Sequence, residues 1–161
     1  MKAISLWQPW ATLVALGEKK IETRAWRTTH RGTLAIHATQ KMTREMKLLC
    51  ETEPFASSLD RVFAAGDELP LGAIVAVCEL VDCAQIVRAY RPLLENTFAV
   101  RANGNVIIPT DSERAFGDWI DGRFAWILKD TRRLDYPVPC RGAQGLFDVP
   151  RDVLARIEAQ L

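Results

Sequence analysis

The sequence has 161 residues, of which 48% are hydrophobic and 25% charged, and its formal net charge is +1. This length predicts one domain with a real hydrophobic core, and the average composition excludes a disordered chain and a fibrous repeat. No apolar run approaches the ~20 residues of a membrane span, and the N-terminus lacks a basic region followed by an apolar stretch. We therefore expect a cytoplasmic protein with no membrane partner.

The hydrophobic pattern in the first half of the chain predicts short strands with helices between them. A strand is expected at 2–6, a helix at 9–16, and strands at 20–26 and 33–38. Residues 43–66 have a helical pattern that breaks near Pro54, with Leu48, Leu59, Val62 and Phe63 as expected core positions. The run at 73–82 is apolar on both faces, which indicates a central strand.

The second half continues the pattern with clearer turn signals. Asn103-Gly104 predicts a hairpin between 98–102 and 105–108, and Thr110 and Glu113 have the spacing of a capping box at the start of a short helix. Residues 123–129 alternate as a strand, residues 134–149 predict a proline-marked loop, a turn and a last strand, and 152–161 predict a helix. Strands at irregular spacing with helices inserted between them favour an α+β mixed barrel over a doubly wound sheet.

Charge and cysteine usage narrow the chemistry. Residues 1–47 hold nine Lys/Arg against three Glu, whereas residues 51–82 hold seven Asp/Glu against one Arg. This asymmetry predicts a basic working face, unless the two segments intermingle in space and cancel. The four cysteines form no CxxC pair and the chain has two histidines, so we predict reduced thiols, no metal site and no cofactor.

Residues 19–37 carry seven Lys, Arg or His side chains beside Trp26. In a strand, Lys20, Glu22 and Arg24 project from one face, while Lys19 lies at the bend before it. The set is either a solvated ion-pair ladder or an anion-binding group in which Glu22 orients its neighbours.

Aromatic and polar residues near this segment suggest contacts to a base. Trp26 lies between Arg24 and Arg27, a position suited to stacking or cation–π contact. Trp7 fits the mouth of a cleft or the core equally well, whereas Trp10 and Trp126 fit the core. The Gln8 amide can read a base edge or cap the helix that follows it.

The other titratable candidates have competing roles. His37 fits a structural position on its strand, with proton donation as the alternative, and no second histidine with Ser or Cys at a useful spacing supports a nucleophilic triad. Glu79 interrupts an apolar strand, so it is either a general base or a structural acceptor. A second basic group, comprising Lys129, Arg132, Arg133 and Arg141, either extends a phosphate track or is a solvated loop.

Several ordered motifs resemble the activating signal cointegrator homology (ASCH) domain family. They are SLWQPWA from Ser5, the GxKxxExR pattern of Gly17, Lys19, Glu22 and Arg24, Arg31-Gly32 leading to IHA at 36–38, GAIV at 72–75, ELVD at 79–82, RFAWIL at 123–128 and GAQGLF at 142–147. The helical excursion 41–66 and the variable insertion 84–112 carry little of the match. The resemblance implies one domain over 1–161 with a PUA-like mixed β-barrel, peripheral helices, and a cleft where the GxKxxExR residues face a ligand.

The resemblance also implies RNA or DNA binding, and some small members resemble amidohydrolases acting on N4-acylated cytidine or are ribonucleases. The amidohydrolases use a Lys, a Thr three residues later and a Glu, whereas here Glu22 stands three residues after Lys19 and Thr23 follows it. A carboxylate cannot replace an attacking hydroxyl.

We therefore predict a domain that binds RNA or a modified nucleotide, with DNA as a further candidate. The expected phosphate contacts are Lys19, Lys20, Arg24, Arg27 and Arg31, the expected base readers are Glu22 and Gln8, and the expected stacking residues are Trp26 and Trp7. A metal-independent hydrolase using Lys19, Glu22 and Glu79 is the alternative. A module whose basic face binds an acidic protein partner is the third hypothesis.

Overall fold

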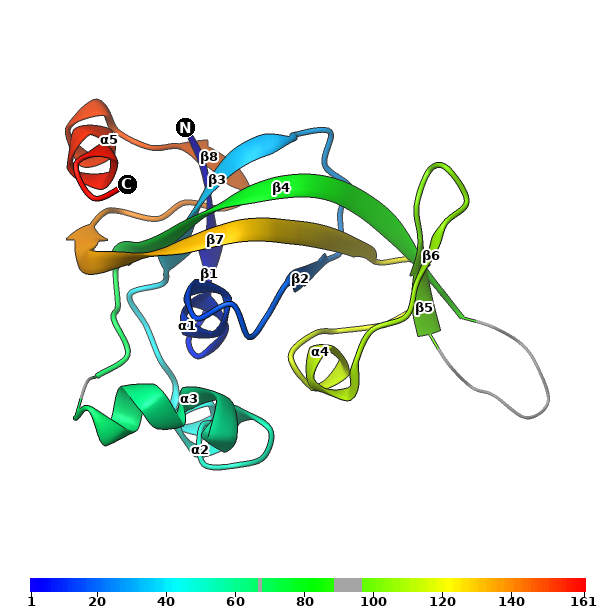
Figure 1. The fold of residues 1–161 in the computed structure, drawn as a ribbon, viewed down its shortest axis with the longest axis horizontal. Helices are drawn as coiled ribbons and strands as arrows, with labels where there is room; N and C mark the ends of the chain where they lie inside the picture. The colour runs from blue at the N-terminus through cyan, green and yellow to red at the C-terminus, as the bar shows by residue number, and fades with distance from the viewer. Residues whose placement is uncertain (67, 89–96) are drawn as a thin grey trace. The chain divides into compact units, whose positions relative to one another are not determined.

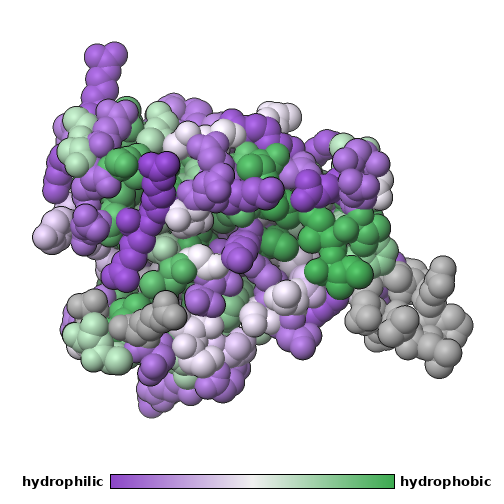
Figure 2. All heavy atoms as spheres, viewed as in Figure 1, coloured by the Kyte–Doolittle hydropathy of each residue, from purple (hydrophilic) through white to green (hydrophobic). Residues whose placement is uncertain are grey.

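A computed structural model describes residues 1–66, 68–88 and 97–161, and these residues form an α+β fold with an eight-stranded mixed sheet (Figure 1). The elements in chain order are β1 (Lys2–Leu6), α1 (Trp10–Ala15), β2 (Ile21–Arg24), β3 (Gly32–Ala38), α2 (Arg44–Leu49), α3 (Phe55–Ala64), β4 (Ala73–Arg88), β5 (Thr97–Val100), β6 (Val106–Ile107), α4 (Asp111–Ala115), β7 (Phe124–Pro139), β8 (Leu146–Asp148) and α5 (Arg151–Glu158). None of the helices in these ranges is long and apolar enough to cross a membrane. Figure 2 shows one face of the molecule, where hydrophilic side chains alternate with hydrophobic patches.

The chain divides into two compact units. The first comprises Met1–Glu18, Thr33–Glu79 and Asp130–Leu161, and the second comprises Lys19–Gly32 and Leu80–Lys129. The long strands β4 and β7 contribute residues to both units. The expectation of one domain over 1–161 stays a prediction, and residues 89–96 of the expected insertion 84–112 lie outside the described residues.

The first unit is built on a parallel pair of strands. β1 pairs with β3 in a register that places Ser5 opposite His37, and β8 pairs antiparallel with β1 on its other edge. Aliphatic side chains of these strands and of β4 and β7 pack with Val153 and Ile157 of α5. The helical spacing of those two residues explains why α5 lies on this core.

The second unit is built on antiparallel pairs. β2 pairs with β7 so that Glu22 lies opposite Trp126, and β5 pairs with both β4 and β6. Its core includes Ile21, Ile86, Trp119 and Ile127. The turn between β5 and β6 contains Gly104, whose positive φ of 84° suits a residue without a Cβ.

Most predicted elements are confirmed, and the N-caps Thr43 and Thr110 both accept the expected backbone hydrogen bond. The loop expected within 134–149 is wrong at its start, because residues 134–139 continue β7. Pro137 and Pro139 lie two residues apart, so their missing N–H groups face one edge of the strand and leave the other edge able to pair.

Of the four core positions expected in α2 and α3, two are confirmed. Leu59 and Val62 are buried, whereas Leu48 and Phe63 are 51% and 45% exposed. Helical spacing places apolar residues on one face, but burial also requires a second element to cover that face.

This difference gives a matched pair of variants on one helix. Leu59→Ala should lower the free energy of unfolding by about 2–5 kcal/mol, because it opens a cavity at a fully buried site. Phe63→Ala should change it by less than about 0.5 kcal/mol, as expected for an exposed position. Chemical denaturation measures both, and equal losses would contradict the burial assigned to α3.

Candidate functional site

The lysine of the GxKxxExR pattern lies inside the second unit. Lys19 is 1% exposed, and its Nζ donates hydrogen bonds to the main-chain carbonyls of Ile21 and Phe116. The same nitrogen lies 3.4 Å from Glu22 Oε2. Three acceptors match the three N–H donors of an ammonium group. Lys19 therefore anchors β2 and is not exposed to a phosphate.

Glu22 joins this lysine to the next cation of the pattern. Glu22 is buried, and its Oε1 lies 3.7 Å from Arg24 Nη1, whose side chain is partly exposed. The expected solvated ladder is therefore wrong, because two of its members are buried. At this point of β2 the Arg24 side chain is partly exposed to solvent, and its ion pair with Glu22 orients it.

Trp26 follows immediately and is 37% exposed. Its ring meets the buried Trp126 ring edge-on, with centroids 4.6 Å apart and planes at 89°. The Trp126 indole N–H donates to the Trp26 carbonyl at 3.3 Å. The edge-on contact positions the ring and the hydrogen bond fixes the Trp26 backbone, while part of the ring stays open to solvent.

Three further cations of this segment are exposed: Lys20, Arg27 and Arg31. Arg31 lies 3.3 Å from Asp82 and donates to the carbonyls of Thr28 and His30, so its position is fixed. The second unit thus places Trp26 and these cations in one twelve-residue stretch, 20–31.

Glu113 is a buried carboxylate that the sequence predicted only as part of a helix cap. It accepts a hydrogen bond from the Lys20 backbone N–H. Burial raises the pKa of Glu113, and the hydrogen bond from Lys20 together with the nearby Lys19 charge opposes that shift. Its carbonyl also accepts from the Trp119 indole. In the sequence, only the capping-box spacing from Thr110 pointed to a structural role of Glu113.

Gln8 lies in the first unit and has no exposed atom to offer a base. Its amide is fully buried: Oε1 accepts from Thr12 N at 3.1 Å and Nε2 donates to Pro70 O at 2.7 Å. The structure therefore shows the capping role, extended to a long-range contact with the segment before β4.

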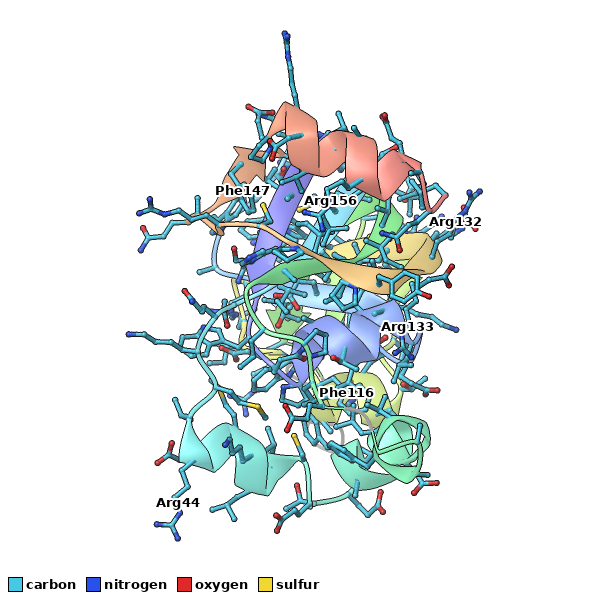
Figure 3. The ribbon with its side chains drawn as sticks, turned by 90° about the vertical axis from the view of Figure 1, so that its left-hand side faces the viewer. Arg44, Phe116, Arg132, Arg133, Phe147 and Arg156 are labelled. Carbon is cyan, nitrogen blue, oxygen red and sulfur yellow. The ribbon has the colours of Figure 1, made fainter. Side chains whose placement is uncertain are left out.

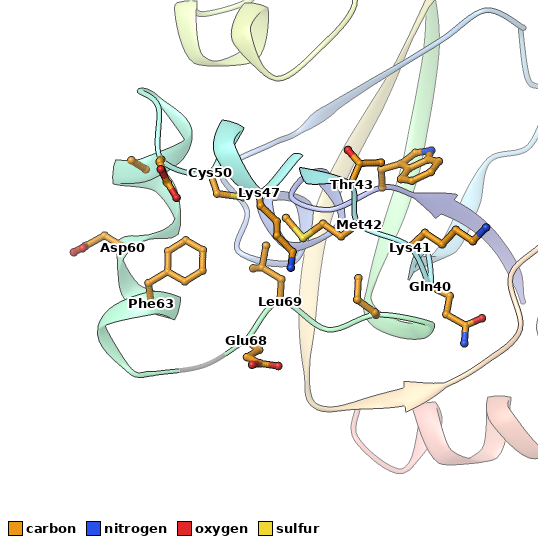
Figure 4. Close-up of a pocket in the computed structure, with 14 residues that line it drawn as sticks. Gln40, Lys41, Met42, Thr43, Lys47, Cys50, Asp60, Phe63, Glu68 and Leu69 are labelled. Atoms are coloured by element: carbon orange, nitrogen blue, oxygen red, sulfur yellow. The ribbon is translucent and has the colours of Figure 1, made fainter. Parts of the chain in front are cut away.

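Trp7 is exposed and lines a hollow of about 1080 Å³ in the first unit. Figure 4 shows Lys47, Met42 and Leu69 directed toward this hollow, with Phe63 on its α3 side. The half-exposed apolar side chains of α3 therefore form part of its wall. The sequence had assigned Phe63 to the core instead.

His37 and Glu79 have structural partners in the first unit. His37 is buried, with Nε2 2.9 Å from Cys140 O and Nδ1 3.1 Å from Ser5 Oγ. Ser5 is 32 residues from His37 in the sequence, and the pairing of β1 with β3 places the two opposite each other. Ser5 also donates to Ala143 O. Glu79 accepts a hydrogen bond from the Thr33 hydroxyl at 2.8 Å, which matches the predicted alternative of a structural acceptor.

Across the ranges that the structure describes, no group of three or more His, Cys, Asp or Glu side chains could hold a metal ion. The four cysteines are free thiols in buried positions, and burial raises the pKa of Cys78 to about 12.

These features define an α+β domain of PUA-like fold with a basic, aromatic segment after its first helix. The family model for the ASCH domain matches residues 4–134, and the chain belongs to this family. ASCH domains are generally linked to RNA binding.

Two curated relatives and a group of crystal structures resemble the chain. Activating signal cointegrator 1 from Homo sapiens and from Mus musculus is 37% identical over 82 residues, which is 50% of this chain but only 14% of each relative. Crystal structures of ASCH from Zymomonas mobilis and of a mutant of it share 15% identity with TM-scores of 0.50 and 0.52. Both alignments cover 98% of this chain, and 93% and 96% of the crystallised chains. At this identity they show the fold alone.

The buried His37 predicts a pH dependence of stability. Burial lowers the pKa of His37 below its usual 6.5, and the hydrogen bond to Cys140 opposes this in part. The unfolded chain therefore binds more protons than the folded one as the pH falls through 6.5, so the free energy of unfolding should decrease there. His37→Gln should flatten this dependence between about pH 7 and 5 in denaturation curves. His30→Gln is the control and should leave the slope as in the wild type; an equal flattening would contradict the role of His37.

Proposed function

We propose that this domain binds single-stranded RNA through residues 20–31, with one base stacked on Trp26. The half-exposed ring of Trp26, held edge-on by Trp126, is the observation that carries the proposal. Base stacking on an aromatic ring needs an open ring in a fixed position, and it tolerates any base. A single strand offers unstacked bases, whereas a duplex hides them.

The exposed cations of residues 20–31 support phosphate contacts. Arg27 follows Trp26 directly, Lys20 precedes it by six residues, and both are exposed; Arg31 is exposed and fixed by Asp82. Arg24 adds a guanidinium oriented by Glu22. Arginine binds phosphate with paired N–H donors, so a preset orientation reduces the ordering cost of binding.

The contact set is smaller than the sequence predicted. Lys19 and Gln8 are left out because their polar atoms are buried and used inside each unit. Glu22 acts by positioning Arg24. The same exposed groups suit DNA or a modified nucleotide, which the binding assay compares directly.

The hydrolase alternative receives less support from the geometry. Lys19 faces two carbonyl oxygens and Glu22, and Glu79 accepts from Thr33, so each candidate catalytic group has a structural partner. A protein-binding role for the basic segment predicts no preference for nucleic acid over another polyanion.

Salt-dependent titrations of a short single-stranded RNA test the proposal. Arg27→Ala should weaken binding and reduce the slope of log K against log salt by about 0.7, the value for one phosphate contact with a single strand. Arg24→Ala should act in the same direction. Trp26→Leu should weaken binding at every salt concentration without changing the slope, because stacking releases no counterions.

Two exposed residues of the first unit are matched controls. Arg156→Ala removes a surface arginine on α5, and Tyr136→Leu removes an exposed aromatic ring on β7. Both should bind RNA as the wild type does. If Arg27→Ala and Arg156→Ala weakened binding equally, net charge alone would explain the interaction, and a site at 20–31 would be refuted. Tight binding of a polyanion without bases, such as heparin, would favour the protein-partner hypothesis.

A further inference from the structure

A second, smaller cavity lies within the first unit, and none of the residues that line it belongs to the proposed RNA contact. It has a volume of about 210 Å³, is open to solvent on one side, and is lined by residues of α1, α3, the segment before β4, β4 itself and β7. Much of its wall is apolar and buried, including Val62, Val75 and Leu134. A single water needs only roughly 10–15 Å³, so the cavity has room for a small organic molecule.

One buried polar atom faces this cavity without a partner. Thr12 lines it from α1 and is 4% exposed, and its Oγ1 makes no hydrogen bond to any residue that the structure describes. A helical threonine can donate to the carbonyl four residues earlier, but Thr12 Oγ1 makes no such bond; the Gln8 side chain accepts from the Thr12 backbone N–H only. A buried hydroxyl without a protein partner is unfavourable unless a ligand or a water molecule bonds to it.

Charged side chains of both signs complete the lining. Glu68, Arg133 and Asp135 line the cavity, and among the described residues none of them pairs with another. Figure 3 shows Arg133 extending from β7 near α1, the helix that carries Thr12. All three residues are exposed, so one guanidinium and two carboxylates lie on the solvent side of a hollow whose buried wall is partly apolar.

We propose that this cavity binds a small zwitterion, an α-amino acid with a short apolar side chain. The Arg133 guanidinium pairs with its carboxylate, Glu68 and Asp135 pair with its ammonium group, and the Thr12 hydroxyl donates to the carboxylate. The apolar wall takes the side chain. An anion alone would leave both carboxylates unpaired, and a cation alone would leave Arg133 unpaired.

Calorimetric titration of the full chain with three matched probes tests this ligand class. L-Valine carries both charged groups, isobutylamine lacks the carboxylate, and isovalerate lacks the ammonium group. L-Valine should bind at least tenfold more tightly than either partial molecule, because each of them loses one charge-assisted pair.

Substitutions at the buried hydroxyl separate binding from folding. Thr12→Val should weaken L-valine binding at least tenfold, while the melting temperature without ligand stays the same or rises, because the variant removes an unpaired buried hydroxyl. Thr12→Ser should restore binding. Arg133→Met should weaken binding comparably, whereas Arg132→Met, which changes the neighbouring arginine that bonds Leu161 O, should bind as the wild type does.

Three outcomes would overturn the proposal. The first is that no probe gives heat up to high millimolar concentrations, in which case water bonds the Thr12 hydroxyl. The second is that all three probes bind equally. The third is that Thr12→Val and Arg133→Met leave L-valine binding unchanged. RNA binding depends on residues of the second unit, so either proposal can fail while the other stands.

Discussion

The buried ammonium group of Lys19 is the constraint on which the second unit depends. It connects the start of β2 with the Phe116 carbonyl after α4, a residue 97 positions away, and it balances the Glu22 carboxylate. A buried charge is tolerated only when it is fully paired, and removing one partner of a buried pair is strongly destabilising. Because Lys19 fixes Glu22, and Glu22 lies beside Arg24, one internal contact sets the orientation of an arginine that reaches solvent.

The sequence identified this segment but assigned wrong exposures within it. A lysine in a basic stretch resembles a phosphate ligand, and only the fold shows that distant carbonyls surround it. Gln8 gives the same result, since its partner Pro70 is 62 residues away. Local spacing predicts which side chains share a strand face, whereas burial depends on chain segments that spacing cannot reach.

The fold was easier to predict than the site for a related reason. Strand alternation, the Asn103-Gly104 turn and the N-caps at Thr43 and Thr110 are local signals, and the structure confirms them. The errors lie where a local signal needs a distant partner: among the described residues no element covers Leu48 and Phe63, and the segment 134–139 continues a strand despite its prolines. The Ser5–His37 contact follows from strand register in the same way.

In the proposed RNA site, the burial of one tryptophan ring of the second unit prepares the other ring for binding. Trp126 is fully buried opposite Glu22 on β7, so its position is set by the core. It holds Trp26 through an edge-to-face contact and a hydrogen bond to the Trp26 carbonyl. An exposed aromatic side chain normally loses rotamer freedom when a ligand orders it, and a ring that is already fixed avoids much of that loss. A buried residue that never touches a ligand can therefore determine how strongly its exposed neighbour binds one.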